Sequence, residues 1–230
     1  MGFLIDMLRE AWDLLTSFDP EFRSILWLTL LVSGAATAIG VVVGVPLGVA
    51  LGAGRFRGRG AAMALVNTGM GMPPVLAGLV LLLLLWNDGP LGAWGLLFTP
   101  IAMIAAQALL AIPIAAGVTA GAVRGLPPEA HEQVRALQLG RWARGVVLAR
   151  EAWPGVAAGA AAAFGRVVSE VGAVLVVGGN IEGETRVLTT AIVQEARRAD
   201  FGAALALGIV LLVLALTVNA FLTWFQLREA

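Results

Sequence analysis

Residues 201–225 read FGAALALGIVLLVLALTVNAFLTWF and contain no charged side chain. About 20 mostly apolar residues are enough for a helix to cross roughly 30 Å of hydrocarbon. A helix that is apolar all round belongs in a membrane or deep inside a large core. In a chain of 230 residues, this stretch predicts a transmembrane helix.

Four further stretches meet the same criteria, so we expect five transmembrane helices in an all-α polytopic membrane protein. The other four are residues 25–51, 63–86, 100–122 and 153–177. The whole chain is 59% hydrophobic and 13% charged, whereas soluble domains are about 45–50% apolar and about 25% charged. This composition excludes a soluble enzyme. The zero net charge also argues against a nucleic-acid partner.

The N-terminal segment has a different pattern. Over residues 3–18, the apolar residues Leu4, Met7, Leu8, Trp12 and Leu15 share one helical face. The segment is short and charged, which favours a helix lying on the membrane interface. We therefore divide the chain into an interfacial helix at residues 1–22 and a membrane domain at residues 23–230.

The distribution of arginines predicts the orientation, because positively charged loops face the cytoplasm. Nine arginines fall on one side of the expected spans: Arg55, Arg57, Arg59, Arg124, Arg135, Arg141, Arg144, Arg150 and Arg228. The other side carries five: Arg9, Arg23, Arg186, Arg197 and Arg198. We expect the N-terminus outside and the C-terminus in the cytoplasm.

Glycines are frequent in the first span, where Gly40, Gly44 and Gly48 recur every four residues. Small residues at this spacing favour close packing against another helix. The second span likewise contains Gly69, Gly71, Pro73 and Pro74. For both spans the alternative is a set of kinks that lets the helices move or line a path.

The loop between spans three and four, residues 123–152, predicts a helix of its own. Pro127 and Pro128 suit a helix start. Ala130, Val134 and Leu137 form a short apolar stripe. Gly140 is expected to supply a left-handed C-terminal cap. Two interpretations remain open: a helix lying on anionic lipid, or one that docks into a soluble partner.

The fourth span contains two ionisable residues, Arg166 and Glu170, with Ser169 between them. On one helix, residues four apart share a face and pair. Ionisable groups in a span should face protein or water. They form either a self-neutralising structural pair or part of a polar ring around an anion path.

The segment that follows, residues 178–192, begins with two glycines and is rich in hydroxyl groups. Hydroxyls, backbone amides and a planar guanidinium are the usual donors to tetrahedral oxyanions. The same composition is also typical of an ordinary loop. The candidate donors are Asn180, Thr185, Arg186, Thr189 and Thr190.

Several of these segments together resemble the permease of tungstate ABC importers. They are FGRVVSEVGA at 164–173, GGNI at 178–181, Thr185-Arg186, Thr189-Thr190 and NTGMGMPP at 67–74. The run EQVRALQLG at 132–140 resembles the coupling loop of ABC importer permeases. It departs from that pattern because its Glu stands eight residues before the Gly and the Ala-Ala pair is interrupted.

This resemblance implies a permease subunit of an ATP-driven importer for tungstate, with molybdate second, in a prokaryotic cell membrane. The oxyanion would pass by alternating access through a homodimeric pore. Two cytoplasmic ATPase subunits would carry ATP and Mg²⁺, and an outer binding protein would deliver the anion. The expected path residues are Arg166, Ser169, Glu170, Asn180, Thr185, Arg186, Thr189 and Thr190. The expected ATPase contacts are Glu132, Ala136, Leu137 and Gly140.

The chain has no phosphate-loop motif of the Gly-Lys-Ser/Thr type, so we expect no enzyme activity, cofactor or metal in this subunit. Alternatives are a permease for another tetrahedral oxyanion such as sulfate, or a channel or secondary carrier that needs no ATPase. A membrane enzyme is the weakest alternative, because His131 is the only histidine and the chain has no Cys.

Overall fold

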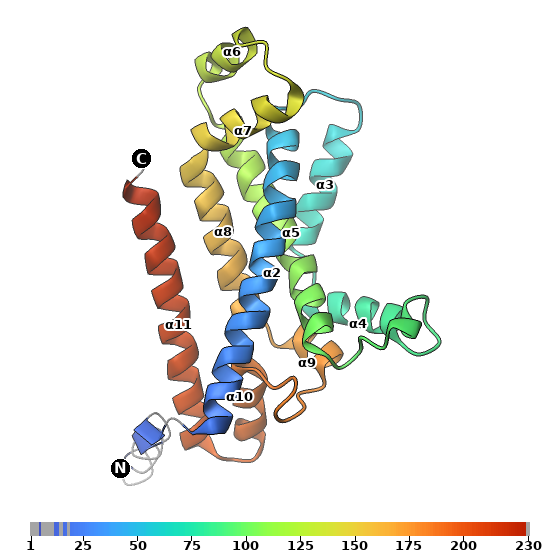
Figure 1. The fold of residues 1–230 in the computed structure, drawn as a ribbon, viewed down its shortest axis with the longest axis vertical. Coiled ribbons are helices and arrows are strands. Elements are labelled where there is room, and N and C mark those ends of the chain that lie inside the picture. The colour runs from blue at the N-terminus through green and yellow to red at the C-terminus, as the bar shows by residue number, and fades with distance from the viewer. Residues whose placement is uncertain (1–4, 6–11, 14–15, 18, 229–230) are drawn as a thin grey trace. The chain divides into compact units, whose positions relative to one another are not determined.

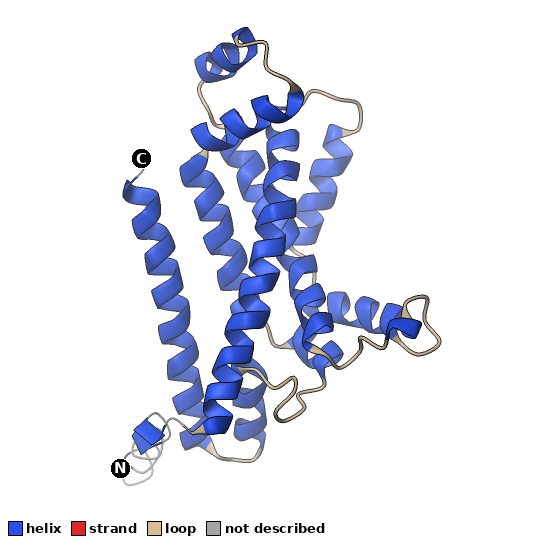
Figure 2. Cartoon of the chain, viewed as in Figure 1, coloured by secondary structure: helices blue, strands red, loops and turns tan. Residues whose placement is uncertain are grey.

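The computed structural model describes residue 5, residues 12–13 and 16–17, and residues 19–228. All regular structure within these residues is helical, with no strand (Figure 2). The all-α fold class is therefore confirmed. The amphipathic helix expected over residues 3–18 falls mainly outside the described residues. The expected boundary between residues 22 and 23 lies inside a helix that begins at Pro20.

Ten α-helices and one 3₁₀ turn follow one another between residues 19 and 228 (Figure 1). They are α2 (Pro20–Ala53), α3 (Arg59–Met70), α4 (Pro74–Leu85), η1 (Gly92–Trp94), α5 (Pro100–Arg124), α6 (Pro128–Ala136), α7 (Arg141–Glu151), α8 (Trp153–Val168), α9 (Gly172–Gly178), α10 (Leu188–Arg197) and α11 (Phe201–Arg228).

Three helices of the described chain, α2, α5 and α11, are unbroken and apolar enough to cross a membrane. Two helix pairs, α3 with α4 and α8 with α9, pass the same test only when each pair counts as one broken span. The expected five spans are thus present, but two of them are interrupted.

The first interruption lies within the expected span at residues 63–86. Helix α3 ends at Met70 and α4 begins at Pro74, after Pro73 in an extended conformation (ψ 123°). Proline lacks the amide hydrogen that a continuous helix needs, and it moves the preceding residue away from helical dihedrals. The span expected over residues 63–86 is therefore divided into two helices, and the kink that Pro73 and Pro74 left open is the form it takes.

The second interruption lies within the expected span at residues 153–177. Helix α8 ends at Val168, and α9 begins at Gly172. The Glu170 carboxylate accepts a hydrogen bond from the Ala173 amide (3.1 Å) at the start of α9. Arg166 and Glu170 therefore do not share one continuous helix, and the predicted four-residue helical spacing between them was wrong.

The loop after α5 forms a helix, as expected, but this helix does not end at Gly140. Helix α6 ends at Ala136, and the left-handed conformation falls on Gln138 (φ 48°). Gly140 has φ −58° and directly precedes a second helix, α7. The prediction that Gly140 caps a helix of about ten residues was wrong, because the chain turns two residues earlier.

The helices group into two compact units, which we describe separately. The first unit comprises residues 1–35, 73–107 and 168–217, and the second comprises residues 36–72, 108–167 and 218–230. The core of the first includes Phe22, Ile25, Leu188, Ala191 and Leu207, which join the start of α2 to α10 and α11.

In the first unit, α4 also packs closely on α9. A Cβ added at Gly78 would lie 2.8 Å from the Cα of Ala173, and one added at Gly172 would lie 2.6 Å from a methyl carbon of Val75. These distances are shorter than side chains tolerate. The two helices that follow the interruptions are therefore held together through glycine.

In the second unit, α2 and α5 are in near-backbone contact along a row of glycines. A Cβ added at Gly40, Gly44, Gly48 or Gly52 would lie 2.5–2.8 Å from an atom of α5. Such close approach lets dispersion forces hold helices together where lipid provides no hydrophobic drive. Close packing, rather than kinking, therefore accounts for the repeated glycines of the first span.

Candidate functional site

The segment between α9 and α10 in the first unit is folded around Thr185. Its side chain is fully buried. The Thr185 hydroxyl donates to the Gly178 carbonyl (2.5 Å) and accepts from the Ile181 amide (2.9 Å). Gly179 and Asn180 are both left-handed, with φ of 71° and 55°. Thr185 thus fixes a tight turn instead of presenting a free hydroxyl.

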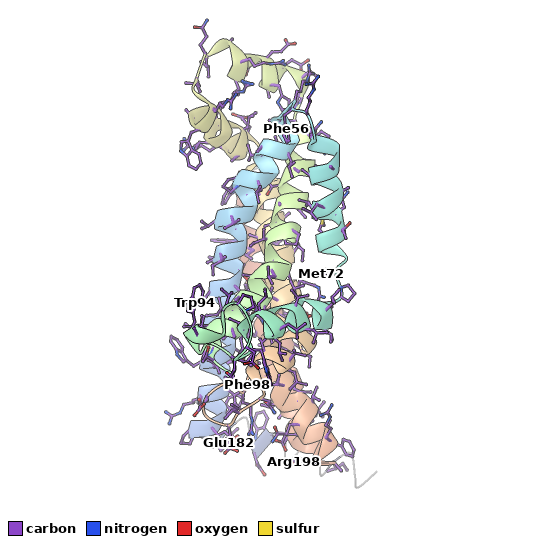
Figure 3. The ribbon with its side chains drawn as sticks, turned by 90° about the vertical axis from the view of Figure 1, so that its right-hand side faces the viewer. Phe56, Met72, Trp94, Phe98, Glu182 and Arg198 are labelled. Carbon is purple, nitrogen blue, oxygen red and sulfur yellow. The ribbon has the colours of Figure 1, made fainter. Side chains whose placement is uncertain are left out.

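The start of this turn also contacts the loop before α5. The Phe98 amide donates to the Val177 carbonyl (2.9 Å), and a Cβ added at Gly179 would lie 2.9 Å from the Phe98 ring. Figure 3 shows Phe98 among the side chains of this region. Any side chain at Gly179 would clash with that ring.

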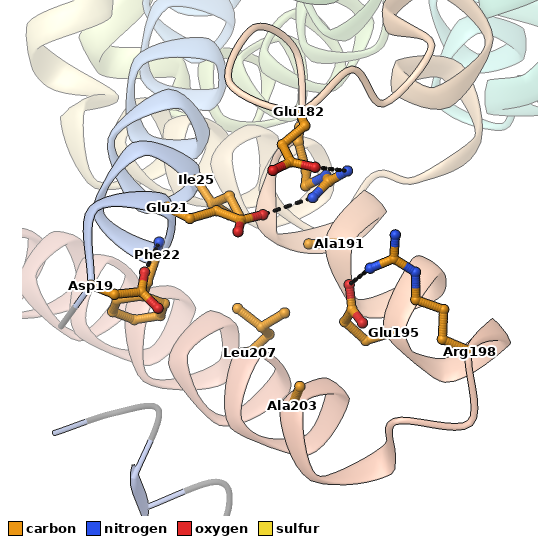
Figure 4. A pocket seen from close by; sticks show the side chains of 11 residues that line it. Asp19, Glu21, Phe22, Ile25, Glu182, Ala191, Glu195, Arg198, Ala203 and Leu207 are labelled. Carbon is orange, nitrogen blue, oxygen red and sulfur yellow. Dashed lines mark hydrogen bonds and ion pairs between the residues drawn. The ribbon is translucent and has the colours of Figure 1, made fainter. Parts of the chain in front are cut away.

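Arg186 is the most buried charged side chain of this segment, with 7% of its surface exposed. Its guanidinium bonds Glu21 at the start of α2 (2.7 Å) and reaches Glu182 at 3.4 Å (Figure 4). No sequence pattern pointed to Glu21, which lies 165 residues away. Two carboxylates already surround Arg186, so its charge is not available to an anion in this conformation.

A pocket of about 310 Å³ opens beside this ion-pair cluster. Its charged lining consists of Asp19, Glu21, Glu182 and Glu195 together with Arg186 and Arg198. Figure 4 shows the second ion pair of the pocket, between Arg198 and Glu195 (3.2 Å). Carboxylates outnumber guanidiniums in this lining, so the pocket disfavours a dianion.

Thr189 and Thr190 stand at the start of α10 and are both buried. The Thr190 hydroxyl accepts from the Val187 amide (3.1 Å) and closes the first turn of the helix. The Thr189 hydroxyl donates to the Glu170 carbonyl (2.9 Å). The two threonines therefore fix α10 against the interruption between α8 and α9.

Two further polar residues complete this network and were missed by the sequence analysis. Thr29 of α2 accepts from the Leu188 amide (2.9 Å) and donates to the Ile25 carbonyl (2.7 Å). Gln194 of α10 forms an amide–amide hydrogen bond with Asn180. A threonine inside an apolar helix was the only available signal for Thr29.

The polar residues at the interruption between α8 and α9 differ from one another in burial. Glu170 is buried and directs its carboxylate at the start of α9. Ser169 is exposed, and Arg166 is half-buried in the last turn of α8. The first unit thus brings together Glu170, Thr185, Arg186, Thr189, Thr190 and Asn180, and Ser169 is the exposed side chain among its predicted path residues.

The predicted coupling segment lies in the second unit. Val134 of α6 and Leu148 of α7 pack with Val49, Val123 and Ala152, which anchors both helices to the ends of α2 and α5. His131 Nε2 also lies 3.1 Å from the Val123 carbonyl oxygen. The segment is therefore a packed element.

The opposite face of this segment is exposed. Glu132, Ala136, Leu137 and Gly140 are all exposed there. Leu137, the last residue of the expected apolar stripe, is 61% exposed, and Trp142 is 77% exposed. This end of the second unit thus exposes two large apolar side chains, one just after α6 and one in α7. Trp142 was not singled out from the sequence, although a tryptophan between two expected spans was a signal.

Among the residues that the structure describes, no group of three or more His, Cys, Asp or Glu side chains is placed to hold a metal ion.

Comparison with known proteins gives the chain a family. The model for binding-protein-dependent transport system inner membrane components matches residues 44–229. The chain is 38% identical over 229 residues to the tungstate uptake system permease protein TupB of Peptoclostridium acidaminophilum, covering 100% of both chains. It is 42% identical over 202 residues to a probable anion ABC transporter permease protein of Haloferax volcanii, covering 86% of this chain and 87% of that one.

The fold also matches a solved structure. A chain in a structure of the MetNI methionine ABC transporter in inward-facing conformations superposes with a TM-score of 0.73 at 18% identity. The match covers 91% of this chain and 96% of the other. The family resemblance inferred from the motifs is confirmed. The chain belongs to the binding-protein-dependent transport system inner membrane components, and it is an ABC importer permease.

Proposed function

We propose that this chain is the permease subunit of an ATP-driven importer for tungstate, with molybdate as second substrate. The observation that carries the proposal is the 38% identity to a tungstate uptake permease over the full length of both chains. The two motif segments that suggested the same family, residues 67–74 and 164–173, coincide with the two interruptions.

The interruptions are the natural place for the anion path. In a membrane, non-helical backbone is tolerated only where protein covers it or where it lines a water-filled cavity. Transporters place substrate at such breaks. Ser169 is exposed at one of them, and Arg166 supplies a positive charge three residues earlier. We assign contact with the passing oxyanion to these two residues.

The other predicted path residues act by positioning. The Glu170 carboxylate accepts from the Ala173 amide, and the Glu170 backbone carbonyl accepts from the Thr189 hydroxyl. These two bonds hold the shape of the interruption. Asn180, Thr185, Arg186 and Thr190 hold the segment that follows it. Their side chains stabilise the wall of the path, and their bonds stay within the protein.

The partners follow from the family. A second copy of the chain would complete the pore, two ATPase subunits would supply ATP and Mg²⁺, and a binding protein would deliver the oxyanion on the outer side. The arginine distribution supports an outer N-terminus and a cytoplasmic C-terminus in a prokaryotic cell membrane. The exposed Glu132, Ala136, Leu137 and Gly140 would form the ATPase contact.

Tungstate uptake by cells that lack their own system tests this function. The chain is expressed with its ATPase and binding protein, and uptake is measured with molybdate or sulfate as competitor. We expect saturable, ATP-dependent tungstate uptake, inhibited by molybdate and unaffected by a 100-fold excess of sulfate. Uptake that persists with an inactive ATPase would contradict the importer mechanism.

A second candidate is a permease for a different tetrahedral oxyanion. It is favoured by the 42% identity to a relative whose name specifies only an anion. Inhibition of tungstate uptake by equimolar sulfate would support this candidate over tungstate.

A further inference from the structure

The second unit contains a strongly basic pocket of about 560 Å³ next to the coupling segment. Five arginines line it, one each from the loop after α2 and from α3, α5, α6 and α7, and no carboxylate does. They are Arg55, Arg59, Arg124, Arg135 and Arg144.

Two of these arginines are held by backbone oxygens. The Arg59 guanidinium donates to the Leu51 carbonyl (2.7 Å) and the Gly52 carbonyl (3.3 Å), and Arg135 Nε donates to the His131 carbonyl (3.1 Å). Within the described residues, no ion pair joins any of the five arginines to a carboxylate. Like charges gathered in one pocket repel each other, so the pocket favours an anion. Guanidinium groups match phosphate oxygens in geometry.

An apolar slot of about 490 Å³ lies nearby between α2 and α7. Val45, Val49, Val146 and Ala149 line it, with Trp142 beside them. A third cavity joins the two: it shares Arg55 and Arg144 with the basic pocket, and Val49 and Gly145 with the slot.

The cleft runs along α2 toward the part of the helix that spans the membrane. It follows α2 back from Ala53 to Val45, about 12 Å at 1.5 Å per residue. That part of α2 belongs to an apolar span, so the slot runs from the charged end of the helix toward the hydrocarbon. Trp142, 77% exposed, lines the slot, and tryptophan is enriched at membrane interfaces.

We propose that this cleft binds an anionic phospholipid, with its phosphate among the five arginines and an acyl chain in the apolar slot. A free phosphate would leave the slot empty. An acidic protein segment would have to enter a slot that lies along a membrane span. The bound lipid would join α7 to the end of α2, so the leaflet's composition would affect the coupling segment. This role goes beyond the proposed transport function.

The test uses the full-length chain in mild detergent, with bound lipid counted by native mass spectrometry. The probes are phosphatidylglycerol, phosphatidylcholine with the same acyl chains, and glycerol phosphate. Arg124→Gln with Arg144→Gln removes two pocket charges. The matched control is Arg57→Gln with Arg150→Gln, because neither residue lines the pocket and the change in net charge is the same.

A second pair of variants tests the slot. A Cβ at Gly145 lies 3.7 Å from the nearest carbon of Val49, in ordinary contact. Gly145→Ala is therefore accommodated, whereas Gly145→Leu fills the slot. If the arginine variant does not elute as an intact protein, the comparison of Gly145→Leu with Gly145→Ala tests the proposal by itself.

We expect phosphatidylglycerol to bind in preference to phosphatidylcholine. Each arginine near an anionic lipid contributes about 1 kcal/mol, so the pocket variant should bind about 30-fold more weakly. Gly145→Leu should weaken binding at least tenfold, with Gly145→Ala and the arginine control within twofold of wild type.

Three outcomes would overturn the proposal. An equal loss in the arginine control would indicate general surface charge. Displacement of the lipid by glycerol phosphate, with Gly145→Leu binding normally, would indicate a free phosphate site. Loss of the lipid when the ATPase subunits assemble on the chain would assign the pocket to an acidic protein segment.

Discussion

At the scale of single residues, the polar groups between Glu170 and Gln194 serve mainly the fold. Thr185, Thr189 and Thr190 each hydrogen-bond a backbone carbonyl or amide, and Arg186 is held by two carboxylates. A buried polar group costs free energy unless it is paired. Their burial and their pairing therefore belong together, and the hydroxyls keep this irregular backbone in one conformation.

Replacing Thr185 tests this role. Thr185→Val leaves the Gly178 carbonyl and the Ile181 amide without their hydroxyl partner, at a cost of about 2 kcal/mol. We expect the midpoint of thermal unfolding in detergent to fall by about 4–8 °C. Thr217→Val is the matched control, because that hydroxyl is exposed and bonds its own helix. Equal shifts in the two variants would contradict the role given to Thr185.

In contrast to Thr185, Arg166 is expected to affect transport and not stability. If its charge contacts the oxyanion, Arg166→Ala abolishes tungstate uptake while the assembled complex is recovered in normal amount. Uptake and pull-down of the ATPase are measured on the same membranes. Recovery of less complex would instead support a purely structural pair at the end of α8.

At the scale of elements, the row of glycines on α2 determines how that helix packs. A Cβ added at Gly48 would lie 2.5 Å from the Ala116 carbonyl oxygen, whereas one added at Gly34 meets nothing within 4 Å. Backbone cannot move aside as a flexible side chain does, so the two positions should respond differently to the same substitution.

We therefore expect Gly48→Ala to destabilise the chain by about 1–3 kcal/mol, the usual cost of overpacking. Gly34→Ala should be neutral or slightly stabilising, because alanine is the better helix former. Midpoints of denaturation in detergent for the two variants give the comparison. A neutral Gly48→Ala would mean that α2 and α5 lie farther apart than the structure indicates.

The continuous and the interrupted spans differ in how well the sequence predicts them. The continuous spans α2, α5 and α11 were predictable because apolar length alone determines them. The prolines left a kink before Pro74 open as an alternative, but hydropathy could not decide for it, because hydropathy measures transfer into lipid and ignores backbone dihedrals. The interruption after Val168 depends on Thr189 holding the Glu170 carbonyl, a contact that no local pattern reveals.

The candidate site was predictable in its residue types but not in its partners. The hydroxyl-rich segment stood out from its composition. Glu21 and Thr29, which bond this segment, lie 165 and 159 residues from Arg186 and Leu188. Only the folded chain brings them together. The left-handed backbone at Gln138, which takes the place of the expected cap at Gly140, was also not predictable from residue type.

At the scale of the whole molecule, the charges differ between the two sides of the expected topology. The expected outer segments carry ten carboxylates against five arginines: Asp6, Glu10, Asp13, Asp19, Glu21, Asp88, Glu182, Glu184, Glu195 and Asp200. A surface field of this sign slows the approach of an anion. The permease should therefore depend on a binding protein that captures the oxyanion and screens its charge.

Deleting the binding protein tests this dependence. At low external tungstate, we expect uptake to fall to background, because the outer surface repels the free dianion. Raising the ionic strength should restore a small part of it, since salt screens exposed charges. Equal uptake with and without the binding protein, measured at the same low concentration, would rule out this dependence.

The contact between α2 and α5 also has a genetic consequence. Every glycine codon begins with two guanines, and any missense change at the first two bases adds at least a Cβ. At Gly44 and Gly48 that atom would fall within 2.7 Å of a backbone oxygen of α5. No conservative replacement exists at either codon, so drift along this row should be confined to synonymous third bases.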